Sequence, residues 1–319
     1  MLDRRTFALR LLIIPFSVIC LGLILLLFAN IDRLYATIIT AWAVLLMLGF
    51  GGMAYLNWLP KTPNESEIRH GKFCEDFEKN SRIGQPINTW TNLSFIAAGL
   101  TVVLIAGKWA VPVPYTMTDI KSYIPLVYGI VVVFLGPGSM LFHASGKKWA
   151  GWFDMISMVA WVGFSFSYTA SHLLLYWFQI PLTSIWVMAG GIILIVGVYT
   201  AVRGFVRTKS GKETKGSGLD VMYIVAGAWI ISEVITMGMI WFGHPPGYRR
   251  STSWFVAAIL AYVAAFICWI PSNGEISIAG IKKQWCKPDS WYQGHGFWHI
   301  FSAVGALFIY LHFASESPV

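Results

Sequence analysis

Residues 122–143 read SYIPLVYGIVVVFLGPGSMLFH, an apolar run without Asp, Glu, Lys or Arg that ends on a serine and a histidine four residues apart. A helix of about 20 apolar residues is long enough to cross the hydrocarbon core of a bilayer. The whole chain has the same character, because 56% of its 319 residues are hydrophobic and only 12% are charged. A water-soluble domain normally carries about 25% charged residues. The sequence therefore predicts an all-α, polytopic membrane bundle.

Similar apolar runs divide the chain into nine candidate membrane spans. They lie near residues 8–29, 34–59, 88–108, 122–143, 152–175, 184–203, 221–242, 252–270 and 294–314. Residues 61–87 are polar and rich in charge, so they form a connecting segment between an N-terminal transmembrane hairpin (1–60) and a seven-helix core (88–319). We expect this core to be the catalytic unit.

The positions of Lys and Arg indicate how the chain is oriented. With the N-terminus inside, 18 of the 23 Lys and Arg residues fall in inner segments. Because positive charge favours the cytoplasmic side, we expect a multi-pass membrane protein with a cytoplasmic N-terminus. These charges lie in loops between apolar runs, so the net charge of +8 reflects topology. We expect no nucleic-acid partner.

Four cysteines, Cys20, Cys74, Cys268 and Cys286, lie too far apart for a CxxC-type metal site or a disulfide framework. Cys74 precedes the first core helix and Cys286 precedes the last, so both belong to one side of the membrane. A bridge between them is compatible with an oxidising compartment and not with the cytoplasm. The state of these two cysteines therefore tests the orientation.

Ionisable side chains inside membrane helices are costly, so each one indicates a partner or a function. Ser139 and His143 share a helical face at the end of the fourth span. Asp154 lies near the start of the fifth span, and His295 and His299 form a second same-face pair at the start of the last span. Because the fourth span ends on the side where the fifth and last spans begin, all these groups lie at one membrane face.

Three neutral imidazoles, from His143, His295 and His299, predict a catalytic zinc site, since such sites keep a fourth position for water. Zinc lowers the pKa of its bound water to about 7. Asp154 is then the expected general base, and later the acid for the leaving amine. Ser139 is expected to hydrogen-bond the zinc water or the developing oxyanion.

Packing is the alternative interpretation of each polar residue taken singly, because a lone histidine or serine in a helix is more often a satisfied packing residue. The coincidence at one membrane face is what favours a site. His172 and His312 lie near the opposite ends of their spans, where we expect snorkelling or interfacial roles. Glu233 has no obvious partner in the sequence. An interhelical hydrogen bond explains it at least as well as a place in the cavity lining, so Glu233 is not included in the predicted site.

The order and spacing of these five polar residues on seven helices resemble the CREST superfamily, which contains alkaline ceramidases, adiponectin-type receptors and Per1-like proteins. The stretch QPINTWTNL (85–93), preceded by Cys-Glu-Asp (74–76), is most similar to the opening of alkaline ceramidases. The resemblance covers roughly residues 73–314. It implies a zinc ion held by the three histidines, catalytic support from the serine and the aspartate, and cleavage of ceramide to sphingoid base and fatty acid.

The resemblance also implies a calcium site near the start of the core, built from acidic residues around Cys-Glu and a glutamate three residues before Asn-Thr. Gln85 occupies that last position, and only Glu75 and Asp76 remain acidic nearby. This departure argues against calcium dependence. Alkaline ceramidases are also expected to open to the lumen, which is the face opposite to the one that the charge count predicts.

The sequence thus predicts a membrane zinc amidohydrolase whose substrate is ceramide or a related N-acyl lipid. One alternative is a lipid-binding, receptor-like protein of the adiponectin receptor type that uses the same zinc core. Another is a Per1-like lipid-remodelling hydrolase that acts on an anchor ester. The Asn-Thr-x-x-Asn-Leu opening and the short loops favour the amidohydrolase.

Overall fold

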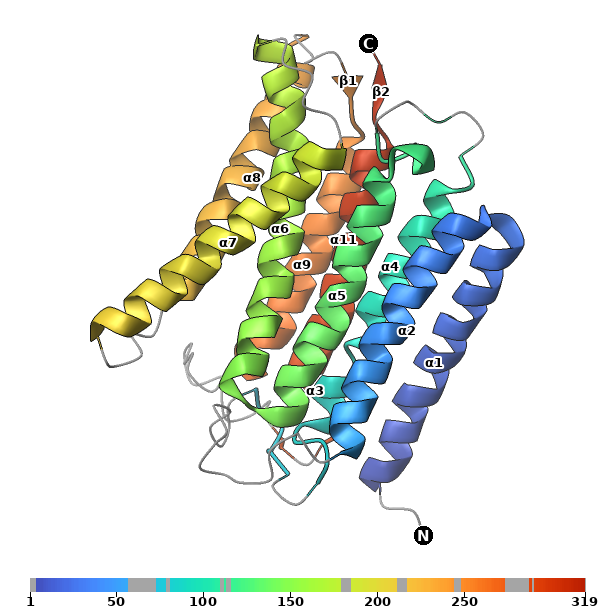
Figure 1. The fold of residues 1–319 in the computed structure, drawn as a ribbon, viewed down its shortest axis with the longest axis vertical. Coiled ribbons are helices and arrows are strands. Elements are labelled where there is room, and N and C mark those ends of the chain that lie inside the picture. Colours follow the sequence, from blue (N-terminus) through green and yellow to red (C-terminus); the bar gives the residue numbers. More distant parts are fainter. Residues whose placement is uncertain are drawn as a thin grey trace.

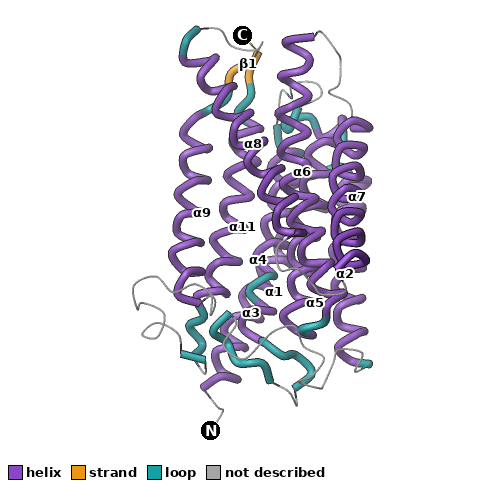
Figure 2. Tube along the Cα trace, turned by 90° about the vertical axis from the view of Figure 1, so that its left-hand side faces the viewer, coloured by secondary structure: helices purple, strands orange, loops and turns teal. Residues whose placement is uncertain are grey.

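The computed structural model describes residues 4–56, 73–78, 81–109, 112, 116–178, 185–210, 217–243, 248–272, 287–288 and 290–318. Within these ranges the chain consists almost entirely of helices (Figure 2). Eight described helices are long and apolar enough to cross a membrane, and Met188–Val202 is a shorter apolar helix. The prediction of an all-α, polytopic membrane bundle is confirmed.

The helices run roughly along one axis, and the two chain ends lie at opposite ends of the bundle (Figure 1). A short 3-10 turn, Ile120–Ser122, precedes α5, and two short strands, β1 (Tyr248–Arg249) and β2 (Ser317–Pro318), pair antiparallel near the C-terminus. The helices are α1 (Arg4–Asn30), α2 (Arg33–Tyr55), α3 (Pro86–Trp90), α4 (Leu93–Ala106), α5 (Ile124–Ser145), α6 (Lys148–Phe178), α7 (Ile185–Ser210), α8 (Ser217–Trp241), α9 (Thr252–Ser272) and α11 (Gly294–Ala314).

Helix α5 is the quoted apolar run, and its ends have clear local causes. It begins with Pro125 in its first turn, where the fixed φ of proline suits a helix and no N–H is lost. It ends at Gly146, whose φ of 63° is the left-handed conformation that commonly caps a helix. His143 therefore sits in the last turn of the helix.

The third predicted span, 88–108, corresponds to the candidate span Pro86–Ala106, which contains a break between two helices. The five-residue α3 ends at Trp90, and α4 begins at Leu93. Thr91 and Asn92 join them, and Thr91 Oγ1 donates hydrogen bonds to the carbonyls of Ile87 and Asn88. The break leaves α3 as a separate element at the end of the bundle.

The core helices approach closely where small residues face one another, as in many membrane bundles. A Cβ on Gly99 of α4 would lie 2.6 Å from the carbonyl oxygen of Gly129 of α5. The N-terminal hairpin packs on the same two helices (Figure 1). Trp42 of α2 donates from Nε1 to the carbonyl oxygen of Ile130 at 3.0 Å.

A buried ionic cluster lies at the end of the bundle that holds the C-terminus. Arg250 donates from Nη1 to Glu233 at 2.9 Å and from Nε to Glu316 at 3.0 Å. His312 Nε2 lies 3.2 Å from the Glu233 carboxylate, and His172 Nε2 lies 2.8 Å from that of Glu316. These contacts join α6, α8 and α11 to the segments flanking β1 and β2.

This cluster contains the interhelical hydrogen bond expected for Glu233, because His312 of α11 contacts Glu233 of α8. It corrects two other expectations, since His172 and His312 are buried in ion pairs rather than placed at the membrane interface. Burial acts to raise the pKa of Glu316, but His172 and Arg250 outweigh burial and lower that pKa from 4.5 to about 2. The Glu316 carboxylate is therefore ionised at neutral pH and fixes the chain just after α11.

We expect Arg250→Met to destabilise the fold by about 3–5 kcal/mol, because it leaves two buried carboxylates without their shared cation. Thermal unfolding of the detergent-solubilised protein measures the effect. Arg249→Met is the matched control, since Arg249 is the exposed neighbour of Arg250 in the same strand segment. Equal unfolding temperatures for the two variants would show that the cluster makes no net contribution to stability.

Candidate metal centre

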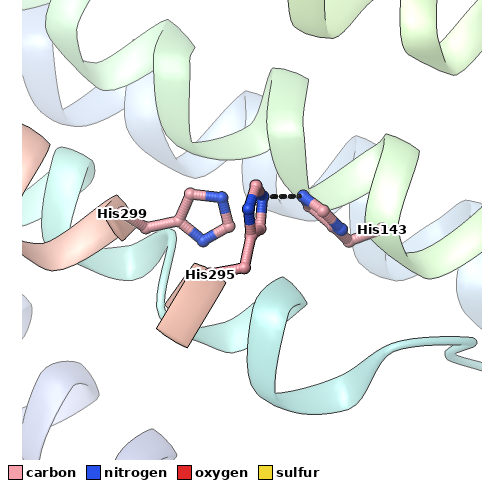
Figure 3. A group of neighbouring side chains, drawn as sticks. All are labelled: His143, His295 and His299. Atoms are coloured by element: carbon pink, nitrogen blue, oxygen red, sulfur yellow. Dashed lines mark hydrogen bonds between the residues drawn. The ribbon is translucent and has the colours of Figure 1, made fainter. Parts of the chain in front are cut away.

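Three histidines from two helices meet at the end of the bundle that also holds α3 (Figure 3). His143 lies in the last turn of α5, and His295 and His299 lie one turn apart at the start of α11. One ring nitrogen from each lies within 4.8 Å of those from the other two. The structure thus brings together the three residues predicted as zinc ligands.

The three side chains fit a metal ion. All are buried, with at most 5% of their surface exposed. Nε2 of His143 lies 3.2 Å from Nε2 of His295, and two imidazole nitrogens facing each other need a proton or a cation between them. Imidazole nitrogen is a preferred ligand of zinc, and three such ligands are typical of catalytic zinc sites.

Two of these histidines are held by hydrogen bonds on the far side of the ring. His143 Nδ1 lies 2.8 Å from Oε1 of Gln85, and His299 Nδ1 lies 2.9 Å from Oγ1 of Thr91. Both partners flank α3, as its N-terminal and C-terminal caps. Metal-ligating histidines are usually oriented by such a second hydrogen bond.

Glu75 fixes the start of α3. Its two carboxylate oxygens each accept a backbone N–H at 2.8 Å, one from Ile87 and one from Asn88. These N–H groups have no partner within the helix, and the partial positive charge of a helix N-terminus favours a carboxylate there. The carbonyl of Glu75 accepts a further bond from Gln85 Nε2 at 2.6 Å.

The residues before Glu75 cover the histidines. The Phe73 ring centroid lies 4.3 Å from that of His295 and 5.1 Å from that of His143. Phe73 and Cys74 have φ of 65° and 67°, the left-handed region, which costs about 1–3 kcal/mol for a residue with a side chain. Such a conformation persists only where surrounding contacts enforce it. Cys74 is disulfide-bonded, and this bond is one of those constraints.

The structure distinguishes the cysteines from one another. Cys20 and Cys268 are free thiols. Cys74 is disulfide-bonded, and Cys286 lies outside the described residues.

Ser139 and Asp154 lie on α5 and α6, which pack against each other. Ser139 is buried one turn before His143 on α5, and Asp154 is half-buried on α6. The two helices pack tightly at this level, because a Cβ on Gly138 would lie 3.0 Å from the hydroxyl of Ser157, one turn after Asp154. The catalytic roles of Ser139 and Asp154 stay predictions.

The supporting residues Gln85, Thr91 and Glu75 are absent from the site predicted from the sequence. Their signal was that polar residues continue through 85–92, from the charged segment into the start of the predicted apolar span. A stretch of buried polar residues beside a metal site is where second hydrogen-bond partners are found. The sequence shows that residues 85–92 are polar, but it does not show that they contact α5 and α11.

A protein-family model described as Ceramidase matches residues 63–316. The matched region contains the three histidines, Ser139 and Asp154, and it leaves out helices α1 and α2. A search of curated proteins gives no match. Because the model covers well over half of the chain, this protein belongs to the ceramidase family.

Proposed function

We propose that this chain is an integral-membrane, zinc-dependent hydrolase that cleaves the amide bond of ceramide or a related N-acyl lipid to sphingoid base and fatty acid. The observation that carries the proposal is the buried cluster of His143, His295 and His299 within the region matched by the ceramidase family. A lipid substrate is consistent with helices that are apolar enough to span a membrane.

The three histidines are the residues that would hold zinc. When bound, zinc lowers the pKa of a water to about 7 and polarises a carbonyl oxygen. Asp154 takes the proton of the attacking water and delivers it to the amine nitrogen as the amide bond breaks. Ser139 donates a hydrogen bond to the oxygen on which negative charge develops.

Calcium independence is part of the proposal, and the contacts of Glu75 support it. Both oxygens of this carboxylate already accept backbone N–H groups of α3, and Gln85 offers a neutral amide where the family resemblance implies a glutamate. Calcium prefers several carboxylate and carbonyl oxygens around one point. The Glu75 carboxylate instead binds the N-terminus of α3, and the Gln85 amide oxygen faces His143.

We expect one zinc ion per chain, and we expect ceramide hydrolysis to be lost on treatment with 1,10-phenanthroline and restored by zinc. EGTA with excess magnesium, as the control for calcium, should leave the rate unchanged. Metal analysis of the purified protein gives the stoichiometry. A zinc content far below one after zinc supplementation would remove the central claim, whereas loss of activity in EGTA would remove only the calcium claim.

We expect Asp154→Asn to abolish turnover while the protein keeps its zinc, because the side chain moves protons and does not bind the metal. Ser139→Ala should lower kcat by roughly 10²- to 10³-fold if its hydroxyl stabilises the oxyanion. Rates with labelled ceramide and zinc content are measured on the same samples. A near-normal rate would assign that residue to packing.

Two observations bear on the side of the membrane that the site faces. The charge count predicts that the N-terminus is cytoplasmic, and the N-terminus and α3 lie at the same end of the bundle (Figure 1). Cys74, just before α3, is disulfide-bonded, and disulfides persist in oxidising compartments. The cytoplasmic N-terminus stays a prediction, and Cys74 tests it.

The disulfide bond of Cys74 predicts that this cysteine is oxidised in freshly isolated membranes, whereas the charge count predicts that it is reduced. Mass mapping after alkylation, with and without reduction, measures its state, and the free thiol of Cys268 serves as the internal control. An oxidised Cys74 would place the metal-site end in an oxidising compartment and contradict the charge count. A reduced Cys74, shielded from an impermeant reagent in intact cells, would support the cytoplasmic orientation.

A further inference from the structure

The short helix α3 contacts two metal ligands that come from two different helices. Its N-cap, Gln85, contacts His143 of α5, and its C-cap, Thr91, contacts His299 of α11. We propose that α3 and its two caps are the positioning element of the metal site: they set the tautomer of both histidines and direct Nε2 of each toward the metal. This inference rests on the proposed zinc function and assigns a role to the polar stretch 85–92.

The tautomer of His143 follows from its neighbours. The Gln85 amide nitrogen faces the carbonyl of Glu75 at 2.6 Å, and a carbonyl only accepts. The amide oxygen of Gln85 therefore faces His143 Nδ1 at 2.8 Å and must accept from it. His143 then carries its proton on Nδ1, which leaves the lone pair of Nε2 free on the side of His295 and His299.

The same reasoning applies to His299. Thr91 Oγ1 lies 3.0 Å from the carbonyl of Ile87 and 3.2 Å from that of Asn88, so its single proton is directed to the helix. The hydroxyl oxygen then accepts from His299 Nδ1 at 2.9 Å. His299 thus also presents the lone pair of Nε2 away from α3. The caps of α3 therefore place the proton on Nδ1 in both His143 and His299.

Helix α3 is itself firmly mounted, which a positioning element requires. The backbone N–H groups of Gly84 and Gln85 donate to the carbonyls of Ala144 and His143 at 2.8 and 3.0 Å, so the chain is tied to the end of α5. On the other side α11 approaches so closely that a Cβ on Gly296 would lie 3.1 Å from the Thr91 methyl group. A side chain at position 296 would require Thr91 to shift by a few tenths of an ångström.

Loss of a second hydrogen bond on a ligating histidine typically lowers metal affinity by 10- to 100-fold. We therefore expect Thr91→Val, which keeps the shape and removes the hydroxyl, to weaken zinc binding by about that factor. Thr91→Ser keeps the hydroxyl and should restore the affinity to within a few-fold of the original. Gln85→Met, which removes the acceptor for His143 at similar length, should weaken zinc binding in the same way.

Thr101→Val is the matched control. Thr101 Oγ1 donates to the carbonyl of Ala97 within α4 at 2.8 Å, the same kind of helix bond as in Thr91, but on a different helix and outside the histidine cluster. The control separates loss of a helix hydrogen bond from loss of a histidine partner. Zinc affinity should be unchanged in Thr101→Val.

The experiment measures zinc affinity of the full-length protein by competition with a chromophoric chelator, alongside the unfolding temperature of each metal-free variant. Weaker binding in Thr91→Val and Gln85→Met, with rescue by serine at position 91, is the expected result. Unchanged affinity in both variants would overturn the inference, and so would a serine variant as weak as the valine variant. If Thr91→Val does not fold, Gln85→Met decides.

The outcomes for the unmodified protein separate this inference from the proposed function. If the unmodified protein binds no zinc, both fail together. If it binds zinc tightly but does not cleave ceramide, the proposed reaction fails while the affinities of the variants still test the role of α3.

Discussion

Desolvation of polar groups is the constraint on which this structure depends. In an apolar bundle, every buried imidazole, carboxylate or guanidinium must find a partner, because an isolated one costs several kcal/mol. The chain meets this constraint at the two ends of α11. At one end His295 and His299 converge with His143, and at the other His312 pairs with Glu233. Between these ends, α11 packs through small and apolar residues.

The two clusters solve the problem differently. In the cluster around Arg250, two carboxylates, two imidazoles and one guanidinium pair with one another. The histidine cluster has three nitrogens pointing at one another and no acidic side chain among its ligand atoms. The first arrangement brings opposite charges together without any ligand, whereas the second is complete only when a proton or a cation lies between the rings.

Much of this architecture could be predicted from the sequence, because it depends on local properties. Apolar runs of membrane length define the helices. Because successive spans cross the membrane in alternating directions, His143, His295 and His299 are predicted to lie at one membrane face, and they meet in the structure. What could not be predicted depends on contacts between distant segments. Arg250 lies outside the apolar runs, so nothing local links it to Glu233 and Glu316. Likewise, the break before α4 follows from the docking of α3 on α5 and α11. Such docking is not visible in the spacing of apolar residues along the sequence.

The positions of the three histidines along the chain have a consequence for biogenesis. His143 lies near the middle of the sequence, whereas His295 and His299 lie in α11, the last of the described helices. A nascent chain that has inserted α1 to α9 therefore contains only one of the three imidazoles. An ion that requires all three could bind only after α11 is inserted, so it would not guide the packing of the earlier helices. These helices must assemble through their own contacts, with α3 already docked when α11 inserts.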